Sequence, residues 1–200
     1  MKPDKDGFII PVVNDDLCVE CRECVEKCPV LNFSQNNNSK PKLFAVRAND
    51  EIRAVSSSGG FFTVAADYVL SNKGYVCGAA FDEDISLNHI IVKDEEGLSK
   101  LRGSKYVQSN IGTVYREIKR YLDNKKDVLF SGTPCQVAGL KNYLGKDYEN
   151  LITIDLLCHG VPSETVLKRY LDEKFIGKTV TGINFRDNRF GWNCEHIIPK

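Results

Sequence analysis

The chain has no excess of charge of either sign and no long apolar run. Lys plus Arg and Asp plus Glu each total 27, so the net charge at pH 7 is zero, and the main electrostatic argument for a nucleic-acid partner is missing. No apolar stretch approaches the roughly 18 residues of a transmembrane helix, because Asp67 interrupts even residues 61–70. The first six residues contain no apolar segment of a secretory signal. We therefore predict a cytoplasmic protein with no nucleic-acid partner and no membrane insertion.

Two common nucleotide-binding motifs are also missing. The sequence contains neither the glycine-rich lysine motif of P-loops nor the G-x-G-x-x-G of dinucleotide-binding folds. The remaining composition is ordinary for a globular chain, with 200 residues, 42% apolar and 27% charged. A chain of this length can form one domain with a small satellite.

Cysteine is abundant and clustered. Four of the eight cysteines follow the pattern C-x-x-C-x-x-C-x-x-x-C-P over residues 18–29. This is the spacing of bacterial ferredoxins, in which a tight loop carries thiolates to a 4Fe-4S cluster. A zinc site is the alternative, but zinc sites use two separated pairs of ligands rather than one run of four. The predicted metal ligands are Cys18, Cys21, Cys24 and Cys28.

This run does not complete a cluster by itself. In two-cluster ferredoxins the fourth cysteine of such a run ligates the other cluster, and this sequence has only one run. Residues 1–11 resemble the stretch between the two motifs of such a ferredoxin, which predicts that the chain begins within the domain. The alternative is a complete single-cluster protein, in which a distant cysteine supplies the missing ligand.

Composition divides the chain into three parts. Residues 1–31 form a partial ferredoxin-type segment, residues 32–42 are a polar linker, and residues 43–200 alternate apolar strands with amphipathic helices. This alternation predicts an α/β fold with a mostly parallel or mixed sheet covered by helices. The expected strands are 43–48, 75–81, 89–92, 127–131, 151–157 and 180–185, and the expected helices are 61–70, 111–122, 136–144 and 163–175.

Two cysteines follow predicted strands of the α/β part. Residues 133–136 have the spacing of a helix capping box, which puts Cys135 in the first helical turn, where the helix dipole favours a thiolate. A small buried side chain is the alternative. Cys158 follows the next strand. Because the carboxyl ends of parallel strands meet at one edge of a sheet, we expect Cys135 and Cys158 to be neighbours and candidates for additional cluster ligands.

Other polar segments are weaker indications of a site. Residues 56–60 consist of three serines and two glycines and precede a predicted helix. Such a helix start suits a phosphate, and a plain helix start without a ligand is the alternative. Residues 100–106 and 185–192 combine cations with aromatic rings, and they either bind an anionic cofactor or form solvated loops. Cys77 is expected in the core, whereas the isolated His89 and His196 receive no role.

These segments occur in an order that resembles the coenzyme F420 hydrogenase/dehydrogenase beta-subunit family. The matching stretches are the cysteine run at 18–29, Ser-Ser-Gly-Gly at 57–60, Gly-Ser-Lys-Tyr-Val-Gln-Ser at 103–109, Gly-Thr-Pro-Cys-Gln at 132–136, Cys-His-Gly-Val-Pro-Ser at 158–163, and Phe-Arg-Asp at 185–187 with Gly-Trp at 191–192. Relatives carry an upstream ferredoxin motif and continue beyond the last of these stretches. The chain therefore resembles a fragment truncated at both ends.

The resemblance implies an iron–sulfur flavoprotein that passes electrons between 4Fe-4S clusters, FAD and a small organic acceptor. The deazaflavin coenzyme is one such acceptor, and a ferredoxin or another redox protein is the implied partner. The implied cofactor-binding residues are Ser57, Ser58, Gly59, Gly60, Lys105 and Tyr106. The implied catalytic residues are Lys105, Cys135 and Cys158.

Two alternatives stand beside the enzyme. A non-catalytic electron-relay subunit would carry clusters and dock a partner protein, but it would bind no flavin. An inactive gene fragment would hold neither iron nor flavin. The iron and flavin contents of the protein therefore distinguish the three hypotheses.

Overall fold

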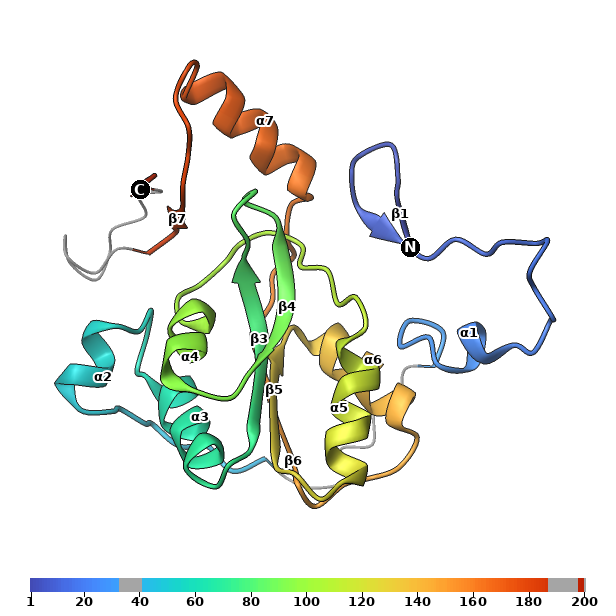
Figure 1. The fold of residues 1–200 in the computed structure, drawn as a ribbon, viewed down its shortest axis with the longest axis horizontal. Helices are drawn as coiled ribbons and strands as arrows, with labels where there is room; N and C mark the ends of the chain where they lie inside the picture. Colours follow the sequence, from blue (N-terminus) through green and yellow to red (C-terminus); the bar gives the residue numbers. More distant parts are fainter. Residues whose placement is uncertain (33–40, 187–197, 200) are drawn as a thin grey trace.

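A four-stranded mixed sheet forms the centre of the α/β part. The computed structural model describes residues 1–32, 41–186 and 198–199. The strands lie in the order β4–β3–β5–β6, with the bounds Tyr75–Phe81 (β3), Leu87–Val92 (β4), Val128–Gly132 (β5) and Leu151–Asp155 (β6). β3, β5 and β6 are parallel, and β4 is antiparallel to β3 (Figure 1). The predicted α/β fold is confirmed.

Helices cover both faces of this sheet. α3 (Phe61–Ser71) and α4 (Glu95–Leu101) lie on one face, and α5 (Val114–Asp123) and α6 (Pro134–Leu144) lie on the other (Figure 1). β5 contributes side chains to the apolar clusters on both faces of the sheet. Val128 and Phe130 join the cluster of α5 and α6, whereas Leu129 joins that of α3 and α4. A strand buried on both faces has an apolar run, as residues 128–130 of β5 do.

The apolar stripe of α5 attaches that helix to the sheet. Val114, Ile118 and Leu122 recur at helical spacing and are all buried. Tyr121 stacks on Tyr75 of β3 with 3.9 Å between the ring centroids. Full burial of an apolar side chain of this size contributes roughly 1.5–3 kcal/mol. The buried residues of the stripe, rather than the exposed polar residues, therefore attach α5 to the sheet.

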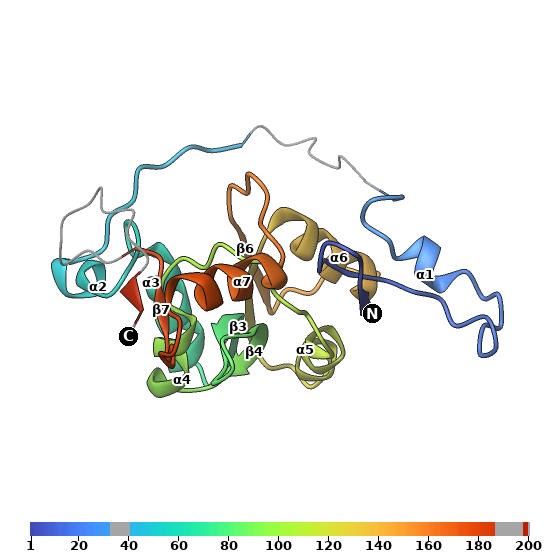
Figure 2. The ribbon, with the colours of Figure 1, turned by 90° about the horizontal axis from the view of Figure 1, so that it is seen from above.

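Smaller elements surround the sheet. β1 (Lys2–Pro3) and β2 (Ile9–Ile10) form a hairpin, α1 (Glu23–Glu26) lies in the cysteine segment, and α2 (Asp50–Ala54) precedes α3. α7 (Glu164–Lys174) lies beyond the β3–β4 turn, and β7 (Ile183–Asn184) pairs with β8 (Ile198–Pro199) (Figure 2). None of the helices among the described residues has the length and hydropathy needed to cross a lipid bilayer.

The structure corrects the predicted strand at residues 43–48. These residues lie in an irregular segment in which Leu43 and Phe44 are 91% and 79% exposed. An apolar sequence forms a strand only where a neighbouring strand offers its edge, and no described strand pairs with this segment. The predicted strand at 180–185 is reduced to β7, and the helix predicted from residue 111 begins at Val114.

Helix α4 is not among the expected elements, although its sequence carries a start signal. Asp94 is the N-cap, and its carboxylate accepts a hydrogen bond from Gly97 N at 2.9 Å. Two glutamates follow in the first turn, where acidic side chains favour a helix. The apolar stripe of so short a helix is weak, so periodicity alone does not reveal it.

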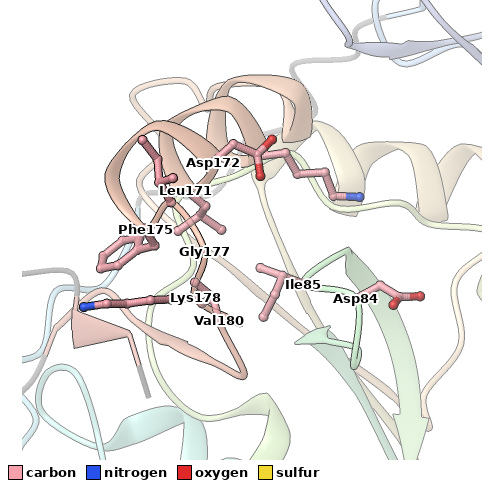
Figure 3. A pocket seen from close by; sticks show the side chains of 10 residues that line it. Asp84, Ile85, Leu171, Asp172, Phe175, Gly177, Lys178 and Val180 are labelled. Carbon is pink, nitrogen blue, oxygen red and sulfur yellow. The ribbon is translucent and has the colours of Figure 1, made fainter.

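One cavity of about 460 Å³ lies between the C-terminal half of α7 and the β3–β4 turn (Figure 3). Ile85, Leu171, Phe175 and Val180 contribute its apolar lining, and Asp84 and Lys178 contribute charged groups. None of the predicted site residues lines this cavity. The candidate site described next is therefore a different part of the molecule.

Candidate functional site

The turn after β5 carries Cys135 on the first turn of α6. Thr133 is the N-cap, Pro134 opens the helix and Gln136 completes a capping box, as predicted. Thr133 N donates to Gln136 Oε1 at 2.9 Å. Cys135 is exposed, with its Sγ 3.1 Å from Thr133 Oγ1, so the alternative of a small buried side chain is wrong. The reactivity of this thiol stays a prediction.

Three other segments hold this turn in place. Gln136 Nε2 donates to Ser109 Oγ at 2.9 Å, and Tyr115 OH on α5 donates to Gln136 O at 2.7 Å. Burial raises the pKa of Tyr115, so its hydroxyl stays a donor at neutral pH. His89 Nε2 on β4 lies 3.1 Å from Ser131 O at the end of β5. Buried polar groups satisfied in this way fix the position of a turn.

His89 is a buried neutral histidine to which the sequence patterns assign no role. It is 5% exposed, and its ring stacks on Phe130 with 5.4 Å between the centroids. Burial lowers the pKa of His89 from 6.5 to about 4. A carbonyl only accepts, so the proton of the neutral ring is on Nε2, which donates to Ser131 O. Nδ1 is the one buried side-chain nitrogen or oxygen without a hydrogen-bond partner among the described residues. Residues 90–92 are apolar on both faces of β4, so no alternation along this strand marks His89 for burial.

Lys105 turns its amine back onto the end of α4. Its Nζ donates to Leu101 O and Arg102 O at 2.9 Å and to Gly103 O at 3.2 Å. These carbonyls belong to the last residue of α4, to its C-cap and to the residue after it, where backbone acceptors have no intrahelical partner. Burial of the amine lowers the pKa of Lys105 to about 8. All three donors of the ammonium group are engaged in this conformation, and a catalytic role for Lys105 stays a prediction.

The serine and glycine turn before α3 is joined to the Lys105 segment. Ser57 Oγ accepts a hydrogen bond from Ser104 N at 2.7 Å. Gly60 is the N-cap of α3 with φ +86°, and a Cβ there would lie 2.9 Å from Ala48 Cβ. The left-handed φ and the lack of space both require glycine at this position. The structure thus brings together residues 56–60 and the Lys105 segment, which were predicted to share a pocket. The ring of Tyr106, which follows Lys105 in the chain, is half-exposed.

The segment after β6 leaves the sheet beside the Cys135 turn. Leu156 N donates to Gly132 O at 3.1 Å, so both cysteines follow the carboxyl ends of adjacent parallel strands, as predicted. Cys158 is exposed, and Gly160 N donates to its Sγ at 3.4 Å. Both sulfur atoms are free thiols, and their action as joint ligands stays a prediction.

The cysteine loop presents free thiols at the surface. Its first three cysteines are exposed and Cys28 is half-buried. Glu20 and Arg22 between them have left-handed φ angles of 53° and 63°, a strained conformation that clusters at ligand-binding loops. Four thiols on one loop suit a 4Fe-4S cluster chemically. Nevertheless, no three Cys, His, Asp or Glu side chains within residues 1–32, 41–186 and 198–199 are gathered closely enough to hold a metal ion. Cys194, His196 and residues 187–192 lie outside the described residues.

Comparisons with known proteins give one family and one fold. Residues 125–197 match the sequence model of a family defined by the C terminus of the coenzyme F420 hydrogenase/dehydrogenase beta subunit. A solved structure of the F420-reducing NiFe hydrogenase complex from Methanosarcina barkeri, a xenon derivative, contains a similar chain, with a TM-score of 0.52 and 21% identity. The match covers 69% of this chain and 52% of that chain, so this chain spans about half the length of that one. No curated protein matches the sequence.

Proposed function

We propose that this chain is a member of the coenzyme F420 hydrogenase/dehydrogenase beta-subunit family, whose C-terminal model residues 125–197 match, and that it is an iron–sulfur flavoprotein oxidoreductase. The family match supports a redox protein, and the 4Fe-4S cluster, the FAD and the small organic acceptor are our proposal for this chain. The proposal divides the chain into a cluster-binding segment at residues 1–31 and a flavin and substrate domain from residue 43. The proposed ligands of this cluster are Cys18, Cys21 and Cys24, with Cys28 or a more distant cysteine as the fourth.

The observation that carries the proposal is a set of hydrogen bonds that joins the polar turns. Segment 103–109 contacts the turn before α3 through Ser57, the turn after β5 through Gln136, and the segment after β6 through Pro162. The last of these bonds runs from Gln108 N to Pro162 O at 3.0 Å. Ligands of open α/β folds bind at the carboxyl ends of the strands. Serine hydroxyls, glycine amides and an ammonium group joined at such an edge favour an anionic cofactor.

The proposed roles follow from the hydroxyl, the charge and the aromatic ring that these residues present. Ser57 Oγ accepts a hydrogen bond, so its own proton is available to a phosphate oxygen. Lys105, whose pKa is about 8, is mostly protonated at pH 7 and adds a positive charge beside that phosphate. The exposed ring of Tyr106 offers a surface for stacking. A bound flavin supplies the exchange between one-electron and two-electron chemistry that the protein's side chains lack.

The test is anaerobic purification of the full chain with assays for iron, acid-labile sulfide and released flavin. We expect about four irons and flavin per chain, the content of one 4Fe-4S centre. Cys21→Ser should lower the iron content, whereas Cys77→Ala, which removes a fully buried thiol remote from the loop, should leave it unchanged. Iron without flavin would refute the flavoenzyme in favour of an electron-relay subunit, and the absence of both would refute the proposal altogether.

A ferredoxin or another redox protein is the proposed electron partner, and the deazaflavin coenzyme is the first acceptor to test. The rate at which a reduced ferredoxin reduces the loaded protein tests the electron donor. The rate at which each organic acceptor then reoxidises the protein tests the acceptor. Reoxidation by no organic acceptor would contradict the enzyme hypothesis even if iron and flavin are bound.

A further inference from the structure

The hairpin β1–β2 is bonded to the α/β part on one side of the candidate site. Ile9 N donates to Gln108 Oε1 at 2.8 Å, and Gln108 Nε2 donates to Ile9 O at 3.3 Å. The amide of Gln108 thus imitates a neighbouring strand, since it pairs with both the donor and the acceptor of one residue. Figure 2 shows the hairpin beside the first turn of α7, in agreement with these contacts.

Ser163 provides a second and independent contact. It is the N-cap of α7, a position where serine ordinarily accepts a hydrogen bond from the first turn of its own helix. Here the side chain makes no capping bond; its hydroxyl instead donates to Asp6 O at 2.6 Å. Ser163 is 0% exposed. Because a buried hydroxyl needs a hydrogen-bond partner, this bond links the hairpin to the start of α7.

Gly7 shows how closely the hairpin approaches α7. Its φ is +83°, and a Cβ at this position would lie 2.5 Å from Thr165 Cβ. Both the left-handed backbone and the close approach require glycine. The hairpin turn therefore packs directly on the first turn of the helix that follows the Cys158 segment.

Gln108 joins this docking surface to the turns of the site. Its backbone N donates to Pro162 O, while the adjacent Ser109 accepts from Gln136. At the other end of the cysteine loop, Asn142 Nδ2 of α6 donates to Lys27 O at 3.4 Å. The loop is thus tethered at one end to α6, which carries Cys135, and at the other end to Gln108 and to Ser163, which lies five residues after Cys158.

We infer that Gln108 and Ser163 are positioning residues, which hold the cysteine loop at a fixed place relative to the turns after β5 and β6. Neither residue touches a reacting atom in this arrangement; each acts through the hairpin. The consequence for electron transfer rests on the proposed function, whereas the docking of residues 1–32 does not.

Hydrogen exchange of the Ile9 amide and limited proteolysis within residues 11–32 test the inference on the full chain without any cofactor. Gln108→Leu keeps the size of the side chain and removes both bonds to Ile9. The loss of two net hydrogen bonds should shift the equilibrium between the docked and the undocked hairpin by about tenfold or more. We therefore expect exchange at Ile9 and cleavage within residues 11–32 to accelerate by at least about tenfold, while amides of β3 keep their protection.

Two more variants and a control distinguish a loss of hairpin docking from a general loss of folding. Gly7→Ala and Ser163→Ala should have the same effect, and neither changes the sheet. Asn124→Leu is the control, because the side-chain amide of Asn124, the C-cap of α5, donates to Arg120 O of that helix. An Ile9 amide that is unprotected in the unaltered chain, or that exchanges unchanged in all three variants, would overturn the inference.

In the cofactor-loaded protein, Gln108→Leu should slow reduction of the flavin from the cluster while the iron and flavin contents stay unchanged. A reduction rate equal to that of the unaltered protein would overturn the positioning role. If the unaltered chain binds neither iron nor flavin, the proposed function fails, and the exchange experiment still decides whether the hairpin docks.

Discussion

Protonation of His89 should make the stability of this protein depend on pH in a defined window. Burial lowers the pKa of His89 from 6.5 to about 4 in the folded chain. Above pH 6.5 the imidazole is neutral in both states and has no pH effect. Between pH 6.5 and 4 the unfolded chain binds the proton and the folded chain does not, so stability falls as the pH falls. One pKa unit corresponds to about 1.4 kcal/mol, which gives a loss of about 3 kcal/mol at pH 4 and about 2 kcal/mol at pH 5.

Carboxylates also titrate in this window, so the measurement is a difference between variants. His89→Gln removes the titration and keeps an amide donor for Ser131 O. Urea unfolding at pH 7 and pH 5 gives the free energy of unfolding of each protein. The unaltered chain should lose about 2 kcal/mol more than His89→Gln between these two values.

The exposed His159 supplies the control. His159→Gln should lose as much stability between pH 7 and pH 5 as the unaltered chain. An equal loss in His89→Gln and the unaltered chain would refute the conclusion that the His89 ring is buried and neutral. It would also remove the reason for placing its proton on Nε2.

Two substitutions test the packing beneath the candidate site. Tyr115→Phe removes the bond to Gln136 O and should cost about 1 kcal/mol, measured as a lower urea midpoint with an unchanged slope; an unchanged midpoint would show that the bond contributes nothing. Phe130→Ala leaves a cavity at a fully buried position between β5 and helices α5 and α6. It should lower the free energy of unfolding by about 3–5 kcal/mol. A thermal unfolding temperature within a few degrees of the unaltered protein would contradict the assignment of Phe130 to the core.

Several local features can be predicted because their causes lie within a few residues. The capping box at Thr133 and Gln136 depends on side chains three positions apart, and the structure contains it. The apolar stripe of α5 and the nearly continuous apolar run at residues 75–81 likewise indicate their burial. Cys77 is expected in the core and is fully buried.

Other features depend on partners that are remote in sequence. Residues 43–48 have the composition of a strand, but no described edge pairs with them. Lys105 has the pattern of a loop cation, and its amine instead binds carbonyls of α4, a helix that is not among the expected elements. His89 belongs to no motif, and its ring is buried because β4 pairs with β3 and the ring stacks on Phe130 of β5.

The cysteine loop, the kinds of elements and the turns that follow the strands can be read from local spacing, since they depend on residues within one or two helical turns. Which turns meet depends on the packing of the folded chain. Gln108 and Ile9 are 99 positions apart and Gln136 and Ser109 are 27 apart, so no local pattern records their pairing. Their contacts form because strand order and helix packing bring polar groups to one edge, where burial then requires that each find a partner.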